Sequence, residues 1–205
     1  MRLGSCWQCE HPAENNLFCT YCNSLQRPMT DYFSFFGLPH KLRLDETELQ
    51  KKFYQLSKLL HPDRYTRRAQ RERDYSLEAT AILNNGYRVL RDPVLRAEYV
   101  LREQGLENGE PRSAQVPPEL LEEVFEWNMA LEELRDGDAS VLHQLQQARD
   151  TLRGMQRDLD GQLHSQFDAW DNSQDLAALG RIRGLLDKRK YVQNLVSEVE
   201  KALAA

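Results

Sequence analysis

The sequence lacks long apolar runs and is poor in the patterns that build strands. No stretch approaches the roughly 20 consecutive apolar residues that a membrane helix needs, so we predict no membrane contact. Val and Ile are few, and no run alternates apolar and polar residues between turn pairs, which disfavours a sheet. Neither a signal peptide nor an Arg-rich presequence precedes the first cysteine. This pattern favours a bacterial cytoplasm, or the mitochondrial matrix for a processed eukaryotic form.

Catalytic signatures are also missing from the sequence. It has no Ser-His-Asp arrangement, no Gly-rich phosphate loop and no carboxylate-histidine metal motif. An enzyme that used His61 and Asp63 as acid and base would need a pocket and a reachable substrate. The net charge of −5 argues against nucleic acid as the main partner. We therefore predict a binding or regulatory protein, not an enzyme.

Cysteine is absent beyond residue 22, and the four cysteines form two Cys-x-x-Cys pairs, Cys6/Cys9 and Cys19/Cys22. This spacing lets four thiolates surround one zinc ion. The segment has almost no apolar core of its own, so metal binding would supply its folding free energy. Two disulfides, a redox pair and an iron–sulfur cluster are alternatives that the spacing leaves open. We predict one structural zinc ion.

A basic amphipathic helix is predicted to precede the tripeptide His61-Pro62-Asp63. Asp45 stands where the helix cap is expected. One face of this helix collects apolar residues at spacings of four, three and four: Leu49, Phe53, Leu56 and Leu60. Pro62 lacks an N–H group and biases His61 away from helix, so the helix ends near residue 60. Taken alone, the tripeptide is also compatible with an ordinary helix-ending turn.

The surroundings of the tripeptide are basic in an acidic chain. From Lys41 to Arg73, ten basic residues stand against five acidic ones. A local positive patch steers a protein toward an acidic surface and speeds their encounter. A solvated helix face and a nucleic-acid footprint are the alternatives. A second long helix follows, and packing of the long helices is predicted to use Tyr32, Phe33, Phe36, Phe53, Leu77, Leu83 and Tyr87.

The C-terminal half is predicted to be an antiparallel helical bundle. Three amphipathic helices follow a Pro- and Gly-containing linker, over residues 118–135, 139–170 and 174–203. The first of them has a surplus apolar stripe beside its main seam: Leu121, Phe125 and Met129. This second stripe is either a wider core face or an exposed site for a partner.

Several motifs resemble the HscB family, specialised J-domain co-chaperones of iron–sulfur cluster assembly. They are Tyr32-Phe33, Phe36-Gly37-Leu38-Pro39, His61-Pro62-Asp63, Asn84 and Arg96-Ala97-Glu98-Tyr99. The resemblance runs from about Asp31 to the C-terminus, and a subset of the family, including animal mitochondrial members, has a similar four-cysteine extension. Gly86 is a departure, because relatives tend to carry Ala. A glycine in mid-helix costs roughly 1 kcal/mol, which predicts a locally soft helix.

The resemblance implies an all-α protein that regulates the chemistry of another protein. Its expected parts are a zinc-ribbon-like cysteine module over 1–27, a J-domain over 31–105, a linker over 106–117 and a three-helix bundle over 118–205. The J-domain would stimulate the ATPase of a DnaK/HscA-type chaperone. The residues expected to bind that chaperone are His61, Pro62, Asp63, Lys51, Lys52, Lys58 and Arg64.

The resemblance also implies that the bundle delivers an IscU-type iron–sulfur scaffold protein. The expected scaffold-binding residues are Leu121, Glu122, Phe125, Glu126, Asn128, Met129 and Tyr191. Three of them depart from the family: Glu122 replaces a Met, Asn128 an Arg and Met129 a Glu. Residues 107–136 hold nine acidic and two basic residues, which suits a basic partner surface. Three competing interpretations stay open. They are a general J-protein with another client, self-association through the bundle, and a zinc-ribbon adaptor that contacts nucleic acid.

Overall fold

The computed structural model describes residues 5–13, 16–106 and 120–204, apart from the side chain of Leu121. Within these ranges the regular elements are helices, with short 3-10 turns and two isolated bridges, so the all-α prediction is confirmed. Contacts between Cα atoms divide it into two units, Met1–Arg96 and Ala97–Ala205. None of the described helices has the length and apolar character needed to span a membrane. The predicted domain boundaries remain predictions.

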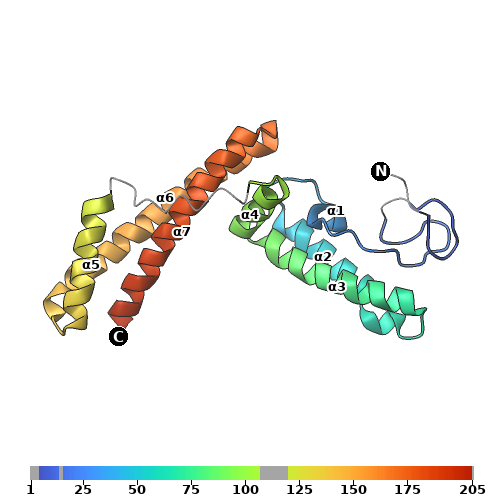
Figure 1. The fold of residues 1–205 in the computed structure, drawn as a ribbon, viewed down its shortest axis with the longest axis horizontal. Coiled ribbons are helices and arrows are strands. Elements are labelled where there is room, and N and C mark those ends of the chain that lie inside the picture. The colour runs from blue at the N-terminus through green and yellow to red at the C-terminus, as the bar shows by residue number, and fades with distance from the viewer. Residues whose placement is uncertain (1–4, 14–15, 107–119, 205) are drawn as a thin grey trace. The chain divides into compact units, whose positions relative to one another are not determined.

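The first unit is built around two long helices that lie side by side (Figure 1). Its elements are α1 (Tyr32–Phe36), α2 (Glu46–Leu60), the 3-10 helix η1 (Pro62–Tyr65) and α3 (Gln70–Arg91), followed by the start of α4 (Pro93–Glu103). The predicted Asp45 cap is confirmed. Asp45 accepts hydrogen bonds from the amides of Thr47 and Glu48. Asp92 likewise caps α4, because its carboxylate accepts hydrogen bonds from the amides of Val94 and Leu95.

The inner face of α3 explains where one core prediction is wrong. Its buried residues are Glu72, Ser76, Ala79, Leu83, Gly86, Val89 and Leu90. Most of them recur every three or four residues, which defines one helical face. Leu77 follows Ser76 directly and is therefore rotated by about 100° from this face. Its side chain is 59% exposed, so Leu77 does not pack between the long helices. Phe53 and Tyr87 do, with stacked rings 4.2 Å apart.

Gly86 lets α1 approach α3 closely. Helix α3 runs through this position without a break. A Cβ atom on Gly86 would lie 3.0 Å from both the Phe36 and the Tyr32 ring, closer than ordinary van der Waals contact. The missing side chain thus makes room for the aromatic residues of α1, and Gly86 has a packing role that the sequence pattern did not indicate.

The second unit contains the C-terminal helices α5 (Leu121–Arg135), α6 (Leu142–Ser173) and α7 (Leu176–Ala204), with a 3-10 turn, η3 (Ala139–Val141), before α6. Helices α6 and α7 run side by side along much of their length (Figure 1). Gly137, with φ 96°, turns the chain after α5, and Gln174, with φ 54°, closes α6. The predicted linker, except Leu106, lies outside the described residues.

The core of the second unit joins one face of each of its three long helices. Its buried residues are Leu120, Val124, Trp127, Ala130, Leu131, Val141, Leu145, Ala148, Leu152, Val192, Val196 and Val199. They include Leu120, Val124, Trp127 and Leu131, four residues of the main seam predicted for the first helix of the bundle. Burial of this seam leaves the opposite face of α5 for solvent, where the second apolar stripe begins.

Candidate functional site

The tripeptide His61-Pro62-Asp63 forms an exposed turn at the end of α2. Pro62 opens η1, and the amide of Asp63 donates to Nδ1 of His61 at 3.3 Å. The Asp63 carboxylate lies 3.6 Å from the same nitrogen. The two side chains are 56% and 86% exposed. Imidazole and carboxylate are therefore presented to solvent as one pair, within reach of a partner.

Side chains of the loop satisfy two of the last carbonyls of α2. A helix ends with carbonyls that have no intrahelical partner, and Pro62 removes one donor that a longer helix would supply. The Arg64 guanidinium donates to the carbonyl of Lys58 at 3.2 Å. The Tyr65 hydroxyl donates to the carbonyl of Leu59 at 3.0 Å. The turn is thus tied back to the helix that it follows.

Helix α3 satisfies the final carbonyl of α2. The hydroxyl of Ser76, which is fully buried, donates to the carbonyl of Leu60 at 2.7 Å, and the Thr80 hydroxyl donates to it at 3.3 Å. These bonds set the end of α2 against α3 and so position the turn between them. Each is expected to contribute about 1 kcal/mol, as is typical of a buried neutral hydrogen bond.

The predicted basic residues of α2 fall into two kinds. Lys51 and Lys58 are exposed. Lys52 instead donates from Nζ to the carbonyl of Gly37 at 2.7 Å, and it lies 3.7 Å from the Glu48 carboxylate. Lys52 therefore ties α2 to the end of α1, whereas the other two lysines offer their charge to solvent.

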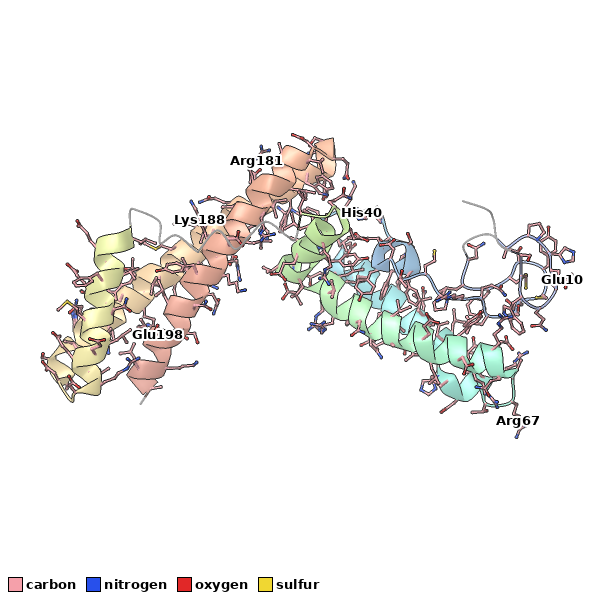
Figure 2. All side chains as sticks on the ribbon, in the orientation of Figure 1. Glu10, His40, Arg67, Arg181, Lys188 and Glu198 are labelled. Carbon is pink, nitrogen blue, oxygen red and sulfur yellow. The ribbon has the colours of Figure 1, made fainter. Side chains whose placement is uncertain are left out.

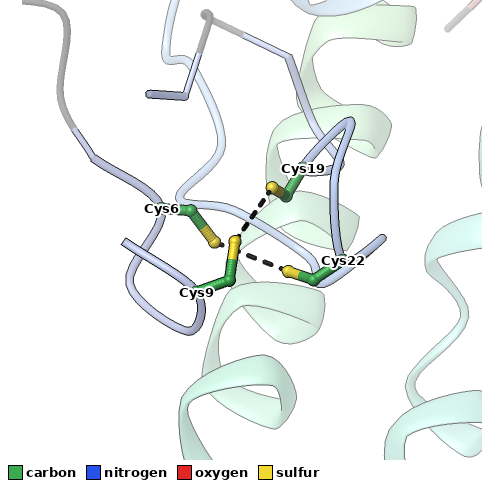
Figure 3. Close-up of side chains that lie close together, drawn as sticks. All are labelled: Cys6, Cys9, Cys19 and Cys22. Carbon is green, nitrogen blue, oxygen red and sulfur yellow. Dashed lines mark hydrogen bonds between the residues drawn. The ribbon is translucent and has the colours of Figure 1, made fainter. Parts of the chain in front are cut away.

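The four cysteines lie in two knuckles with the same backbone geometry. In the first, the amide of Cys6 donates to the His11 carbonyl and the amide of Glu10 donates to the Cys6 carbonyl. The second knuckle repeats this pattern from Cys19. Glu10 and Asn23 follow the second cysteine of each pair, and both have a positive φ, at 62° and 56°. This repeated turn points both pairs of thiols at one place (Figure 3).

The sulfur positions match the ligand shell of a single ion. Sγ atoms of Cys6 and Cys22 are 3.7 Å apart, as are those of Cys9 and Cys19, and all four lie within 4.8 Å of one another. A tetrahedron with metal–sulfur bonds of about 2.3 Å has an edge of about 3.8 Å. A disulfide needs sulfurs about 2.05 Å apart. All four cysteines are free, so the disulfide alternative is wrong for this structure.

The cluster also has the electrostatics of a cation site. Burial acts to raise the pKa of Cys6, but hydrogen bonds, first from the Ser24 hydroxyl and then from backbone groups, lower that pKa to about 5. A backbone hydrogen bond at His11 acts to lower the pKa of Cys9, yet burial and the neighbouring cysteines raise it to about 12. The raised pKa of Cys9 reflects the cost of a further negative charge beside the neighbouring cysteines. A bound cation would offset that cost.

The cysteine module docks on α3, a contact that the sequence analysis did not predict. The Trp7 indole donates to the carbonyl of Leu25 at 2.8 Å, and the Arg71 guanidinium lies over the Trp7 ring at 5.6 Å from its centre. The amide of Leu25 donates to the carboxylate of Glu72 at 3.2 Å. Glu72 is only 6% exposed. These contacts join residues far apart in sequence, which no local pattern indicates.

The second stripe of α5 faces solvent. Phe125 is 66% exposed and Met129 is 47% exposed, so the alternative of a wider core face is wrong for these two residues. Glu122 and Glu126 are exposed as well. With spacings of three or four, these residues share one face of the helix. The side chain of Leu121 lies outside the described residues.

The other two residues predicted for this surface are Asn128 and Tyr191. Asn128 is exposed on α5, next to Met129. Tyr191 is half-buried on α7, and this burial raises the pKa of its hydroxyl. The side chains of Phe125 and Met129 are apolar, exposed and next to each other on the helix, which is typical of a protein-binding surface.

Comparisons with known proteins agree over both halves of the chain. Residues 31–99 match the DnaJ domain, and residues 116–200 match the HSCB C-terminal oligomerisation domain. A protein of Azoarcus sp. named co-chaperone protein HscB homolog is 34% identical over 176 residues, covering 85% of this chain and 94% of its own length. The mouse iron-sulfur cluster co-chaperone protein HscB is 29% identical over 201 residues, covering 95% and 81%.

Solved structures give the same result. The crystal structure of human co-chaperone protein HscB matches with a TM-score of 0.74 and 27% identity, covering 96% of this chain and 97% of that one. Chaperone HscB from Vibrio cholerae matches with a TM-score of 0.65 and 32% identity, covering 83% and 96%. Fold and loop therefore define a J-domain protein with a helical C-terminal domain. The chain belongs to the HscB family of co-chaperones.

Proposed function

We propose that this protein stimulates the ATPase of a DnaK/HscA-type chaperone through the turn His61-Pro62-Asp63. The supporting observation is the turn itself: exposed, and tied by hydrogen bonds to α2 and α3. Asp63 would form a charge-assisted pair with an arginine of the chaperone. His61 would engage polar groups beside it, and Pro62 would hold both side chains in place. The chaperone performs the chemistry.

Basic side chains around the turn would guide the encounter. Lys51 and Lys58 on α2 and Arg64 in η1 are exposed, and they form part of a stretch rich in positive charge. Such a patch raises the association rate with an acidic surface more than it raises affinity. Lys52 would contribute less, since its ammonium is already engaged by the Gly37 carbonyl.

The outer face of α5 would bind the client, which we propose to be an IscU-type iron–sulfur scaffold protein. The mouse and human relatives are named as iron-sulfur cluster co-chaperones. Phe125 and Met129 would supply the apolar contact. Glu122 and Glu126 would form a charged rim. The remaining residues predicted for this surface are Leu121, Asn128 and Tyr191. A self-associating bundle would cover the same face, so the mass in solution has to be measured along with scaffold binding.

We infer that the cysteine module holds one structural zinc ion. Cys6, Cys9, Cys19 and Cys22 offer thiolates at tetrahedral spacing, and an ion there would stabilise a segment with little apolar core. Elemental analysis of purified protein should find about one zinc per chain and no visible absorption. Acid-labile sulfide with a brown colour would instead show an iron–sulfur cluster.

The test of the proposed function is steady-state ATPase of the chaperone with and without this protein. We expect several-fold stimulation by the native chain and none by Asp63→Ala. Because the Asp63 side chain is 86% exposed, the substitution should leave the helical circular dichroism and the melting temperature unchanged. Equal stimulation by the folded variant would contradict the proposal.

A further inference from the structure

A groove of about 210 Å³ lies between the second cysteine knuckle and the turn that follows α2. Six residues line it: Phe18, Asn23, Leu59, Arg64, Tyr65 and Arg68. The first two belong to the cysteine module and the other four to the end of α2 and the segment after it. Residues of the module and of the J-domain loop therefore share one surface.

Contacts with α3 hold the cysteine module in this position. Arg71 packs over Trp7, and buried Glu72 accepts the hydrogen bond of the Leu25 amide. Glu72 also lies near Tyr65: burial raises the pKa of the Tyr65 hydroxyl, and the charge of Glu72 raises it further. An isolated bridge pairs Leu25 with Phe18, which lines the groove, so the contact of Leu25 with α3 also positions Phe18. Module, α3 and loop are thus connected.

The groove has a definite chemical character. Phe18, Leu59 and Tyr65 give it apolar and aromatic walls, while Arg64 and Arg68 place two positive charges on it. No acidic residue is among those that line it. This composition fits a segment that combines a carboxylate with an apolar side chain, since guanidinium groups pair with carboxylates in two-pronged fashion.

The groove is continuous with the surface that the turn presents. Arg64 and Tyr65 follow Asp63 directly in η1. A partner that engages Asp63 is therefore within one or two residues of the groove. The groove adjoins the turn and is positively charged. We therefore infer that the segment bound in the groove belongs to the same partner that engages Asp63.

We propose that the cysteine module completes the chaperone-docking surface, and that the groove receives an acidic segment of the ATP-bound chaperone. This inference rests on the proposed function of the turn. Phe18 would contact the apolar part of the segment, and Arg68 its carboxylate. A metal ion held by the four cysteines would keep the second knuckle, and so Phe18, at the groove.

Adjacent arginines provide a matched test of charge. Arg68 lines the groove, whereas Arg67 does not and extends outward near the tip of the helix pair (Figure 2). We expect Arg68→Glu to raise the Kd for the ATP-bound chaperone about five- to tenfold at ~0.1 M salt, because attraction becomes repulsion. Arg67→Glu changes the net charge equally, and we expect about a twofold rise from weaker steering alone.

Two aromatic residues of the second knuckle test the module itself. Phe18→Ala should raise the same Kd about three- to tenfold, as truncation of a contact aromatic does. Tyr21→Ala is the control, because Tyr21 is 64% exposed, stacks on His11 and does not line the groove. Metal content of each variant verifies that the knuckles remain folded.

The outcomes separate this inference from the proposed function. If the native chain does not stimulate the ATPase, both the proposed function and this inference are wrong. If the native chain stimulates and Asp63→Ala does not, the function stands. In that case the inference is overturned by Arg68→Glu behaving like Arg67→Glu, or by metal-loaded Phe18→Ala behaving like Tyr21→Ala.

Discussion

The turn after α2 and the outer face of α5 are both exposed, yet they are built in opposite ways. At the turn, polar side chains from the loop and from α3 hold the last carbonyls of α2, and the exposed groups are an imidazole and a carboxylate. On α5, the opposite face packs in the core, and the exposed groups are Phe125 and Met129. One surface offers fixed polar geometry and the other offers apolar area.

The two surfaces are suited to different tasks. A rigid polar turn loses little entropy on binding and can demand a particular geometry of its partner. An exposed apolar stripe gains free energy in proportion to the area that it buries, with less dependence on orientation. We therefore propose that the turn triggers the chaperone and that the stripe holds the client. A substitution in one surface should then leave the function of the other intact.

Loss of the apolar anchor on α5 should weaken scaffold binding strongly. Phe125→Asp places a charge where an aromatic anchor would be buried, and we expect the affinity for the scaffold protein to fall about 100-fold, equivalent to about 3 kcal/mol. Isothermal titration calorimetry would measure it. Leu176→Asp is the matched control, because Leu176 is 58% exposed at the start of α7, away from α5 in sequence. Equal losses in both variants would contradict the assignment of the α5 face.

The next effect is on the rigidity of the turn. Tyr65→Phe removes the hydroxyl that bonds the Leu59 carbonyl, and we expect the J-domain to lose about 1 kcal/mol of unfolding free energy. For a domain of this size that lowers Tm by about 4–8 °C. Chaperone stimulation should weaken, while scaffold affinity stays unchanged.

Tyr54→Phe is the control for that substitution. Tyr54 is 57% exposed on α2, so loss of its hydroxyl should leave Tm within about 1 °C of the native value, as surface changes usually do. If Tyr65→Phe were as stable as Tyr54→Phe, the side-chain bonds at the end of α2 would not hold the turn.

Lys58 and Lys52 are both predicted to bind the chaperone, but we expect small and different effects when each is replaced by Ala. Lys58→Ala should reduce the association rate with the chaperone about two- to threefold, with a weaker salt dependence and unchanged stability. Lys52→Ala should lower the unfolding free energy by about 0.5 kcal/mol, because Nζ bonds the Gly37 carbonyl. Stopped-flow binding and chemical denaturation would measure the two quantities. The reverse pattern would mean that Lys52 is the docking residue.

The sequence was most informative where the signal is local. Asp45 caps its helix as predicted, because capping depends on residues two or three positions apart. The cysteine cluster likewise follows from spacing within each pair, together with the repeated turn. Local geometry is set by neighbours in the chain, and the sequence displays those neighbours directly.

It was least informative where packing decides. Spacing placed Phe125 and Met129 beside the main seam but left open whether a core would cover them, and Leu77 was wrongly assigned to the core. The bond between Leu25 and Glu72 joins residues 47 positions apart, so no pattern within a helix reveals it. Such contacts depend on which faces meet in three dimensions.

The most direct test is one ATPase experiment with three proteins, the native chain, Asp63→Ala and Phe125→Asp, each with and without the scaffold protein. We expect Asp63→Ala to give no stimulation under either condition while it binds the scaffold normally. Phe125→Asp should stimulate like the native chain without scaffold and gain nothing when scaffold is added. Two results would contradict the proposal that the turn acts on the chaperone and the α5 face binds the scaffold. They are stimulation by Asp63→Ala, and loss of scaffold-free stimulation in folded Phe125→Asp.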